Sequence, residues 1–182
     1  LSSELDTNVL LSKIMQSARD LLQVERCTLF MLDAEKEELW TKLADGMEPL
    51  RIPMSKGIAG EVAMTGQTLN IPDVYQDARF NPNVDKESGF RTRNMLCMPV
   101  RNNDGTIIGV AQMINKLGDE PFTKIDEELL EAFTAQTAVA LENAMLFQQT
   151  LEMRNYLESN LKSITNLVIT LNNEGRMVTA NH

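Results

Sequence analysis

The residues whose types and spacing could do chemistry lie near the middle of the second half of the chain. Asn115 and Lys116 end an apolar run, Phe122 follows after five residues, and Asp126 and Glu127 follow after three more. A lysine beside two carboxylates could exchange protons with a substrate. The same residues could instead form an ion pair that fastens a helix to a sheet, because breaking one side of a buried pair is costly. The first interpretation makes the chain an enzyme, and the second makes these residues a structural clip.

Other catalytic groups are scarce in the sequence. The single histidine is His182, at the last position, which removes serine–histidine and cysteine–histidine triads. Cys27 and Cys97 lie in separate apolar runs without a neighbouring Cys or His, so we expect reduced, buried thiols. Zinc is unsupported for the same reason. These patterns predict neither a catalytic site nor a metal site in this chain.

Composition and charge restrict the class of partner. Of the 182 residues, 43% are hydrophobic and 24% are charged, and the net charge is -9. A packed core is therefore expected, whereas nucleic acid and anionic membrane surfaces are disfavoured as partners. No apolar run approaches the roughly 18 residues of a membrane span, and no signal peptide opens the chain, so we expect a cytoplasmic protein. A small phosphate held by backbone N–H groups remains compatible with this charge.

Hydrophobic periodicity predicts an alternation of helices and strands. We expect helices over 6–23 and from Thr123 onward, a short helix within 55–66, and strands over 27–33, 38–44, 95–101 and 107–115. The near-continuous apolar character of the last two strands favours a central position in the sheet. A long polar loop is expected over 73–94, and loops of this length are usually functional.

Three regions could form a ligand pocket. The glycines of the stretch 57–60 could place free N–H groups at a helix start, which binds anions, although a simple turn explains the same residues. The polar loop adds aromatic rings for a base and hydroxyl or carboxylate groups for a ribose. Gln112 interrupts an apolar strand, and its amide either pairs with backbone or reads the edge of a ligand base.

The C-terminal part predicts an interaction helix and a second domain. Residues spaced alternately by four and three form one apolar seam with two polar breaks, namely Leu146, Thr150, Met153, Leu157, Asn160 and Ile164. This spacing favours a parallel coiled coil that leaves the domain over a continuous surface helix. The last residues read as a strand, a turn and a strand, which cannot form a core alone.

The sequence resembles the cyclic-nucleotide-binding GAF domains of phosphodiesterases and of cyanobacterial adenylyl cyclases. The resemblance rests on the motif Asn-Lys…Phe-x-x-x-Asp-Glu and on the stretches 51–73 and 89–100, and it covers roughly residues 1–150. It implies an α+β fold, an α/β sandwich with a central antiparallel sheet, helices on one face and a ligand pocket on the other. It also implies a GAF domain over 1–148, a coiled-coil-like helical linker over 149–163 and the first part of a PAS domain over 164–182.

The resemblance further assigns residues to a bound cyclic nucleotide. The cyclic phosphate would lie against Ile58 and Ala59. The ribose and phosphate would be enclosed by Phe80, Asp85, Ser88 and Thr92. The base would be held by Arg26, Thr28, Ala44, Asp45 and Gln112. The clip would contain Asn115, Lys116, Phe122, Asp126 and Glu127, with a Lys116–Asp126 pair, and would not touch the ligand.

The departures from the family pattern favour cAMP as the ligand. Relatives that bind cGMP tend to have an aromatic residue at the position of Ala44 and Glu at that of Gln112. A glutamine can both donate and accept, which suits the amine and ring nitrogen of adenine. We therefore expect a regulatory sensor that binds cAMP, forms a parallel homodimer through its terminal helices and controls a C-terminal output, an adenylyl cyclase.

Other functions of this family fit the sequence less well. One alternative is a cGMP-binding domain of a phosphodiesterase-like protein, and another is a GAF domain that binds nothing and only dimerises. A bilin photoreceptor would need an anchoring Cys beside a His, and a reductase of free methionine sulfoxide would need several exchanging cysteines. Cys27 and Cys97 match neither pattern.

Overall fold

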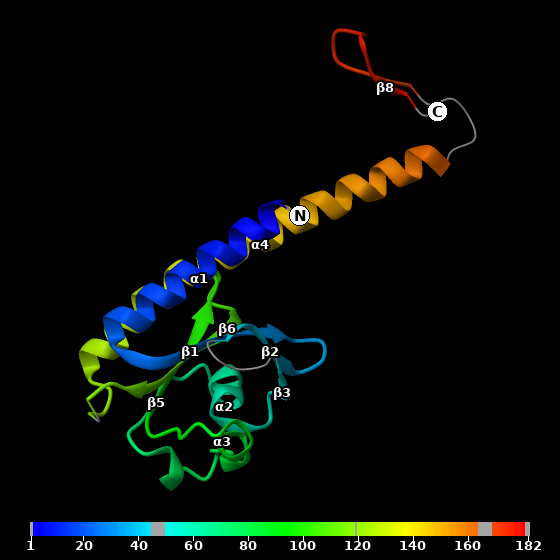
Figure 1. Ribbon diagram of the computed structural model, residues 1–182. Helices are drawn as coiled ribbons and strands as arrows, with labels where there is room; N and C mark the ends of the chain where they lie inside the picture. Colours follow the sequence, from blue (N-terminus) through cyan, green and yellow to red (C-terminus); the bar gives the residue numbers. More distant parts are fainter. Residues whose placement is uncertain (1, 45–49, 119, 164–168, 181–182) are drawn as a thin grey trace. The chain divides into compact units, whose positions relative to one another are not determined.

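The structure, a computed structural model, describes residues 2–44, 50–118, 120–163 and 169–180. The chain forms two compact units, Leu1–Glu142 and Asn143–His182. The first unit contains a six-stranded antiparallel sheet with helices on both faces (Figure 1). None of the described helices is long and apolar enough to cross a membrane.

The sheet is built from β1 (Val24–Asp33), β2 (Glu38–Ala44), β3 (Arg51–Pro53), β4 (Leu69–Ile71), β5 (Met95–Arg101) and β6 (Ile107–Lys116). Their order is β3-β2-β1-β6-β5-β4. The predicted strands 27–33, 38–44, 95–101 and 107–115 correspond to β1, β2, β5 and β6. β1 pairs with β2 and β5 pairs with β6, each antiparallel, and β6 and β5 lie in the interior of the sheet, as their apolar character indicated. The edge strands β3 and β4 were not predicted, because three residues are too few to show an alternation.

One face of the sheet is covered by α1 (Ser2–Leu22) and by the first part of α4 (Lys124–Ser163). The helix α1 contributes Leu11, Met15, Ala18 and Leu22, which lie on one side because they are three or four residues apart. They pack with Leu130 and other residues of α4 against the sheet. The two helices run side by side over the sheet in Figure 1. The predicted α+β fold is thereby confirmed.

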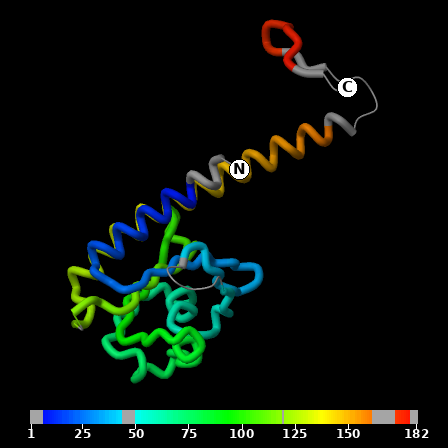
Figure 2. Tube along the Cα trace, viewed as in Figure 1, coloured from blue at the N-terminus to red at the C-terminus, as the bar shows by residue number. Residues whose placement is uncertain are grey.

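The opposite face is covered by α2 (Gly57–Thr65), a 3₁₀ turn η1 (Val74–Gln76) and α3 (Pro82–Ser88). The prediction of a loop throughout 73–94 was therefore wrong in part (Figure 2). A local signal for α3 was present, because the Asn81 side chain accepts a hydrogen bond from the Asn83 N–H and Pro82 is the first helical residue. We call residues 74–94, which contain η1 and α3, the lid.

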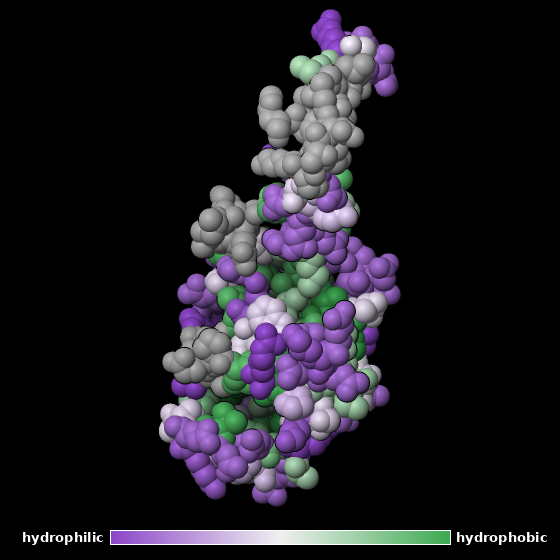
Figure 3. Space-filling view, turned by 90° about the vertical axis from the view of Figure 1, so that its right-hand side faces the viewer, coloured by the Kyte–Doolittle hydropathy of each residue, from purple (hydrophilic) through white to green (hydrophobic). Residues whose placement is uncertain are grey.

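The second unit contains the rest of α4 and a hairpin of β7 (Ile169–Leu171) and β8 (Met177–Ala180). The strand–turn–strand prediction is confirmed, whereas its assignment to a PAS domain stays a prediction. Leu146, Met153 and Leu157 of the predicted seam are between 54% and 61% exposed, and Ile164 lies outside the described residues. Figure 3 shows one face of the whole molecule, on which hydrophobic residues reach the surface between hydrophilic ones.

Candidate functional site

A cavity of about 210 Å³ lies between the sheet and the layer formed by α2 and the lid. Eight of the eleven residues expected to bind a ligand line it, namely Arg26, Ile58, Ala59, Phe80, Asp85, Ser88, Thr92 and Gln112. Sites for small molecules usually enclose about 300–1,000 Å³. A ligand of nucleotide size would therefore have to displace part of the cavity wall.

The start of α2 supplies one end of this cavity. The first N–H groups of a helix have no partner within it, and here they belong to Gly57, Ile58 and Ala59. The N-cap residue Lys56 makes no side-chain cap, and no acidic residue lies in the first turn. The positive end of the helix dipole therefore faces the cavity with a lysine beside it, which favours an anion.

The two glycines of this stretch have different structural reasons. Gly57 has a φ of 75°, which other residues rarely adopt. At Gly60 a Cβ atom would lie 2.3 Å from the backbone oxygen of Met54, so a side chain would push α2 away from the end of β3. The two glycines therefore do more than form a turn, because Gly60 allows the start of α2 to lie close to the end of β3.

The lid is held together by the buried carboxylate of Asp85, which is 7% exposed. It accepts hydrogen bonds from the Thr92 N–H at 2.7 Å, from the Thr92 hydroxyl at 2.7 Å and from the Tyr75 hydroxyl at 2.9 Å. The Tyr75 ring in turn lies 5.1 Å from the Phe80 ring. A ribose or phosphate that bonded to Asp85 or Thr92 would have to share these groups with the lid.

The lid also contains a charged pair, formed by Arg79 and Asp77. Arg79, which lines the cavity, donates to both carboxylate oxygens of Asp77 at 2.9 and 2.6 Å. The hydrogen bonds from Arg79 lower the pKa of Asp77. The guanidinium is thereby directed toward Asp77.

The other end of the cavity offers groups suited to a flat polar ring. The Arg26 guanidinium lies over the Phe90 ring, 3.7 Å from its centroid. The Gln112 amide contacts the Met95 sulfur at 2.9 Å, a weak acceptor that leaves most of its hydrogen-bonding capacity unused. Thr28 faces Gln112 across the β1–β6 pair, and its buried hydroxyl has no hydrogen-bond partner among the described residues. A buried polar atom without a partner points to a ligand or water that satisfies it.

Three expected ligand residues are not among those lining the cavity. Thr28 lies on the same side of β1 as Arg26 and Phe30, which do line it, because alternate residues of a strand share a face. Ala44 pairs with Thr28 through its backbone, and nothing is described of its side chain. Asp45 lies outside the described residues.

Several lining residues were missed from the sequence. They are Phe30, Leu50, Ile52, Pro53, Lys56, Arg79, Asn81, Val84, Met95 and Ile114. The apolar members come from strand faces that look like ordinary core. The period-two alternation of β1 and β6 could have identified Phe30 and Ile114, because they follow Arg26 and Gln112 by multiples of two.

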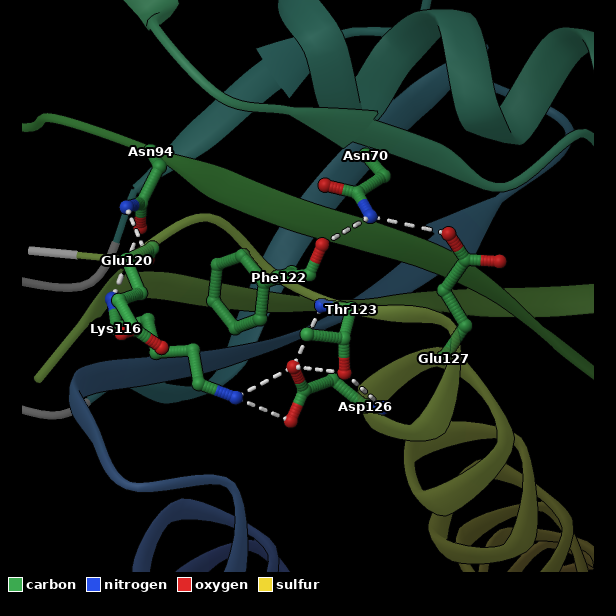
Figure 4. Close-up of polar contacts among 8 residues, drawn as sticks. All are labelled: Asn70, Asn94, Lys116, Glu120, Phe122, Thr123, Asp126 and Glu127. Atoms are coloured by element: carbon green, nitrogen blue, oxygen red, sulfur yellow. Dashed lines mark hydrogen bonds and ion pairs between the residues drawn. The ribbon is translucent and has the colours of Figure 1, made fainter.

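The clip lies away from the cavity and joins β6 to the start of α4 (Figure 4). Lys116 Nζ lies 2.5 Å from both oxygens of Asp126, which is 5% exposed. Burial alone would raise the pKa of Asp126, but hydrogen bonds from Lys116 and from the N–H and hydroxyl of Thr123 outweigh it and lower the pKa. Both groups of the pair are therefore engaged with each other rather than with the cavity.

The remaining residues of the clip fix the same junction. Asn70 on β4 donates to the Phe122 carbonyl and to Glu127, each at 3.0 Å (Figure 4). Hydrogen bonds from Lys124 and Asn70 lower the pKa of Glu127. The Phe122 ring is buried beneath the lysine of the ion pair. This geometry agrees with the structural interpretation of the motif.

The cysteines lie in the core. Cys97 is fully buried, and burial raises its pKa well above the ordinary range of a thiol. Cys27 is buried and contacts the Met15 carbonyl at 3.7 Å. A thiol reacts as the thiolate, so the environment of Cys97 favours a structural rather than a redox role.

A comparison with protein families matches residues 6–141 to the GAF domain. The chain belongs to the GAF domain family. Curated relatives include the dual 3',5'-cyclic-AMP and -GMP phosphodiesterase 11A of Takifugu rubripes, 39% identical over 161 residues, and the corresponding phosphodiesterase 11 of Drosophila melanogaster, 37% identical over 166 residues. Each alignment covers 81% of this chain but only 18% and 11% of the relative.

The solved structures show the same GAF fold. The GAF domain of an Acinetobacter phosphoenolpyruvate-protein phosphotransferase superposes with a TM-score of 0.63, covering 80% of this chain and 96% of that one. Its sequence is 19% identical, so this likeness concerns the fold alone. The GAF fold with its six-stranded antiparallel sheet is thus supported by sequence and structure together.

Proposed function

We propose that this GAF domain is a regulatory sensor that binds a cyclic purine nucleotide, cAMP in preference to cGMP. The observation that favours this function is the pairing of two unlike ends in one cavity. One end presents the uncapped start of α2, which suits a phosphate, and the other presents the Gln112 amide, which is bonded to the weak acceptor Met95 Sδ. The buried, unpaired hydroxyl of Thr28 lies next to Gln112 across the β1–β6 pair. The relatives whose names include both cyclic nucleotides support the same ligand class.

The preference for cAMP rests on the base-facing end. The Gln112 amide can donate to a ring nitrogen of adenine and accept from its amine, whereas guanine presents two neighbouring donors that suit a carboxylate. The Arg26 guanidinium, stacked on Phe90, offers a flat cation to the face of the base. The phosphate would lie at Ile58 and Ala59.

Regulation requires that binding change the structure. The cavity of about 210 Å³ is smaller than a typical nucleotide site, so entry of the ligand displaces the lid and the bound state orders it again around the ligand. The exposed seam of α4 then transmits the change between two chains of a parallel homodimer. The output is C-terminal, through a PAS domain starting at residue 164, and we propose a cyanobacterial type of adenylyl cyclase.

Calorimetric titration of nucleotide-stripped protein with cAMP, cGMP and linear AMP tests the ligand. We expect cAMP to bind more tightly than cGMP, and AMP to bind weakly because its dianionic phosphate is not closed into a ring. Gln112→Glu should reverse the preference, and Gln67→Glu, at an exposed residue away from the cavity, is the matched control. Tighter binding of cGMP would refute the selectivity, and no binding of either cyclic nucleotide by folded protein would refute the sensor and leave the dimerisation module.

A further inference from the structure

Asn115 has an unusual backbone at the end of β6. Its φ is 60°, and its side chain is fully buried. Asparagine tolerates the left-handed region better than most residues, but the conformation is still uncommon within a strand. A buried amide needs partners for both its oxygen and its nitrogen. The conformation is therefore explained by what the side chain bonds to.

The Asn115 side chain holds the base of the lid. Its oxygen accepts from the Arg93 N–H at 2.6 Å, and its nitrogen donates to the Arg91 carbonyl at 2.8 Å. The same nitrogen donates to Glu25 on β1 at 2.9 Å, and Glu25 forms an ion pair with Arg93 at 2.9 Å. One side chain thus satisfies the lid backbone much as a neighbouring strand would.

The two anchored residues enclose Thr92, which belongs to the wall of the cavity. Thr92 gives both its N–H and its hydroxyl to Asp85. The position that Asn115 imposes on residues 91 and 93 therefore sets where Asp85 and α3 lie. A ligand that moves Thr92 must strain or shift the bonds to Asn115.

The next residue in the chain holds the start of α4. Lys116 pairs with Asp126, and its backbone N–H donates to the Asn94 side chain at 2.9 Å (Figure 4). The backbone N–H of Asn115 donates to the Asn94 carbonyl at 3.0 Å. Of these two consecutive residues, Asn115 thus bonds to the lid and Lys116 bonds to the first turn of α4.

We propose that Asn115 is a positioning residue that couples the lid to the first turn of α4. Displacement of residues 91–93 moves Asn115, and Lys116 conveys that movement to Asp126. The coupling in the ligand-free protein does not depend on the identity of any ligand. Its use in signalling rests on the proposed function. The Asn70 bonds to Phe122 and Glu127 provide a separate attachment of the same helix start that does not involve residues 91–93.

Hydrogen exchange of the ligand-free chain, followed by mass spectrometry, tests the coupling. Asn115→Gly keeps the left-handed backbone and removes all three side-chain bonds. We expect the rate of amide exchange to rise roughly tenfold both in 91–94 and in 123–127. A rise of this size corresponds to the loss of one or two hydrogen bonds in net free energy. The matched control Asn70→Ala should raise exchange in 123–127 and leave 91–94 unchanged. Asn115→Gly that loosens 91–94 alone would overturn the proposal.

A second variant approaches the coupling from the helix. Lys116→Met breaks the pair with Asp126 and leaves the Asn115 side chain intact. We expect faster exchange in 123–127 and, by way of Asn115, in 91–94 as well. If Lys116→Met raises the exchange rate in 123–127 but not in 91–94, the coupling is overturned. This result would decide the question even if Asn115→Gly failed to fold.

Saturating cAMP separates this proposal from the proposed function. In the wild-type protein we expect the nucleotide to slow exchange in both segments. In Asn115→Gly it should slow exchange around residues 83–88 but change 123–127 by less than half as much as in wild type. An equal change at 123–127 in both proteins would overturn the coupling. Failure of wild type to bind cAMP or cGMP would refute the sensor, while the ligand-free comparison would still decide the coupling.

Discussion

Replacement of Lys116 by methionine isolates the ion pair of the clip. Methionine keeps the unbranched chain over Phe122 but removes the charge, so Asp126 is left as a buried carboxylate without a counterion. The side chains of the pair are 17% and 7% exposed, so the pair belongs with buried rather than surface ion pairs. Removing one partner of a buried pair costs about 3–5 kcal/mol, compared with about 0–1 kcal/mol at a surface.

The structure places the expected loss at the lower end of that range or just below it. Asp126 keeps two hydrogen bonds from Thr123 and lies in the first turn of α4, where the helix dipole favours a negative charge by about 0.3–1 kcal/mol. We therefore expect the free energy of unfolding to fall by about 2–3 kcal/mol. With a urea dependence of about 2 kcal/mol per molar, the midpoint should move down by about 1–1.5 M.

Urea titration followed by tryptophan fluorescence measures this loss, because Trp40 is the single tryptophan and packs against the core beneath the helices. The control is Lys116→Met combined with Asp126→Asn, which leaves no charge in the site while the amide oxygen still accepts from Thr123. We expect the double variant to regain about half of the lost stability. A loss below about 0.5 kcal/mol in the single variant would refute the reasoning, since the pair would then act as an exposed one.

Three further predictions concern the cavity and its supports. Thr28→Val should raise the free energy of unfolding by about 1 kcal/mol, because it removes a buried unpaired hydroxyl, and should weaken cAMP binding at least fivefold by calorimetry; unchanged binding would exclude the hydroxyl from the ligand site. Gly60→Ala should destabilise by about 1–3 kcal/mol in urea and weaken the anion end, whereas the exposed Met64→Ala on the same helix should do neither. The folded pKa values of Asp126 and Glu25 are lowered, so the stability they contribute is full above the ordinary values of 3.8 and 4.5 and is lost as pH falls through the lowered values. Unfolding free energies measured from pH 6 to pH 2 should therefore drop below about pH 4.5, and a flat profile would contradict the assignment.

The sequence by itself determined the central elements and, through the family resemblance, eight of the residues that line the cavity. Helical spacing identified α1 and α4, apolar runs identified β1, β2, β5 and β6, and the glycines at 57 and 60 identified the start of α2. These are local signals, because backbone geometry fixes the period of a helix or strand and the need for glycine at a given φ. The clip motif was equally local, since Lys116 and Asp126 are only ten residues apart.

Only the tertiary structure decided how these parts are joined. The role of Asn115 depends on Glu25 and on residues 91–93, which lie about 90 and 22 residues away in sequence. No spacing rule relates such positions, because strand order and register bring them together. The orphan hydroxyl of Thr28 likewise became visible only once β6 lay beside β1 and left that oxygen without a partner. The residue types of the site could therefore be recognised from local sequence signals. The proposed coupling of the lid to α4 depends instead on contacts between residues that are distant in sequence.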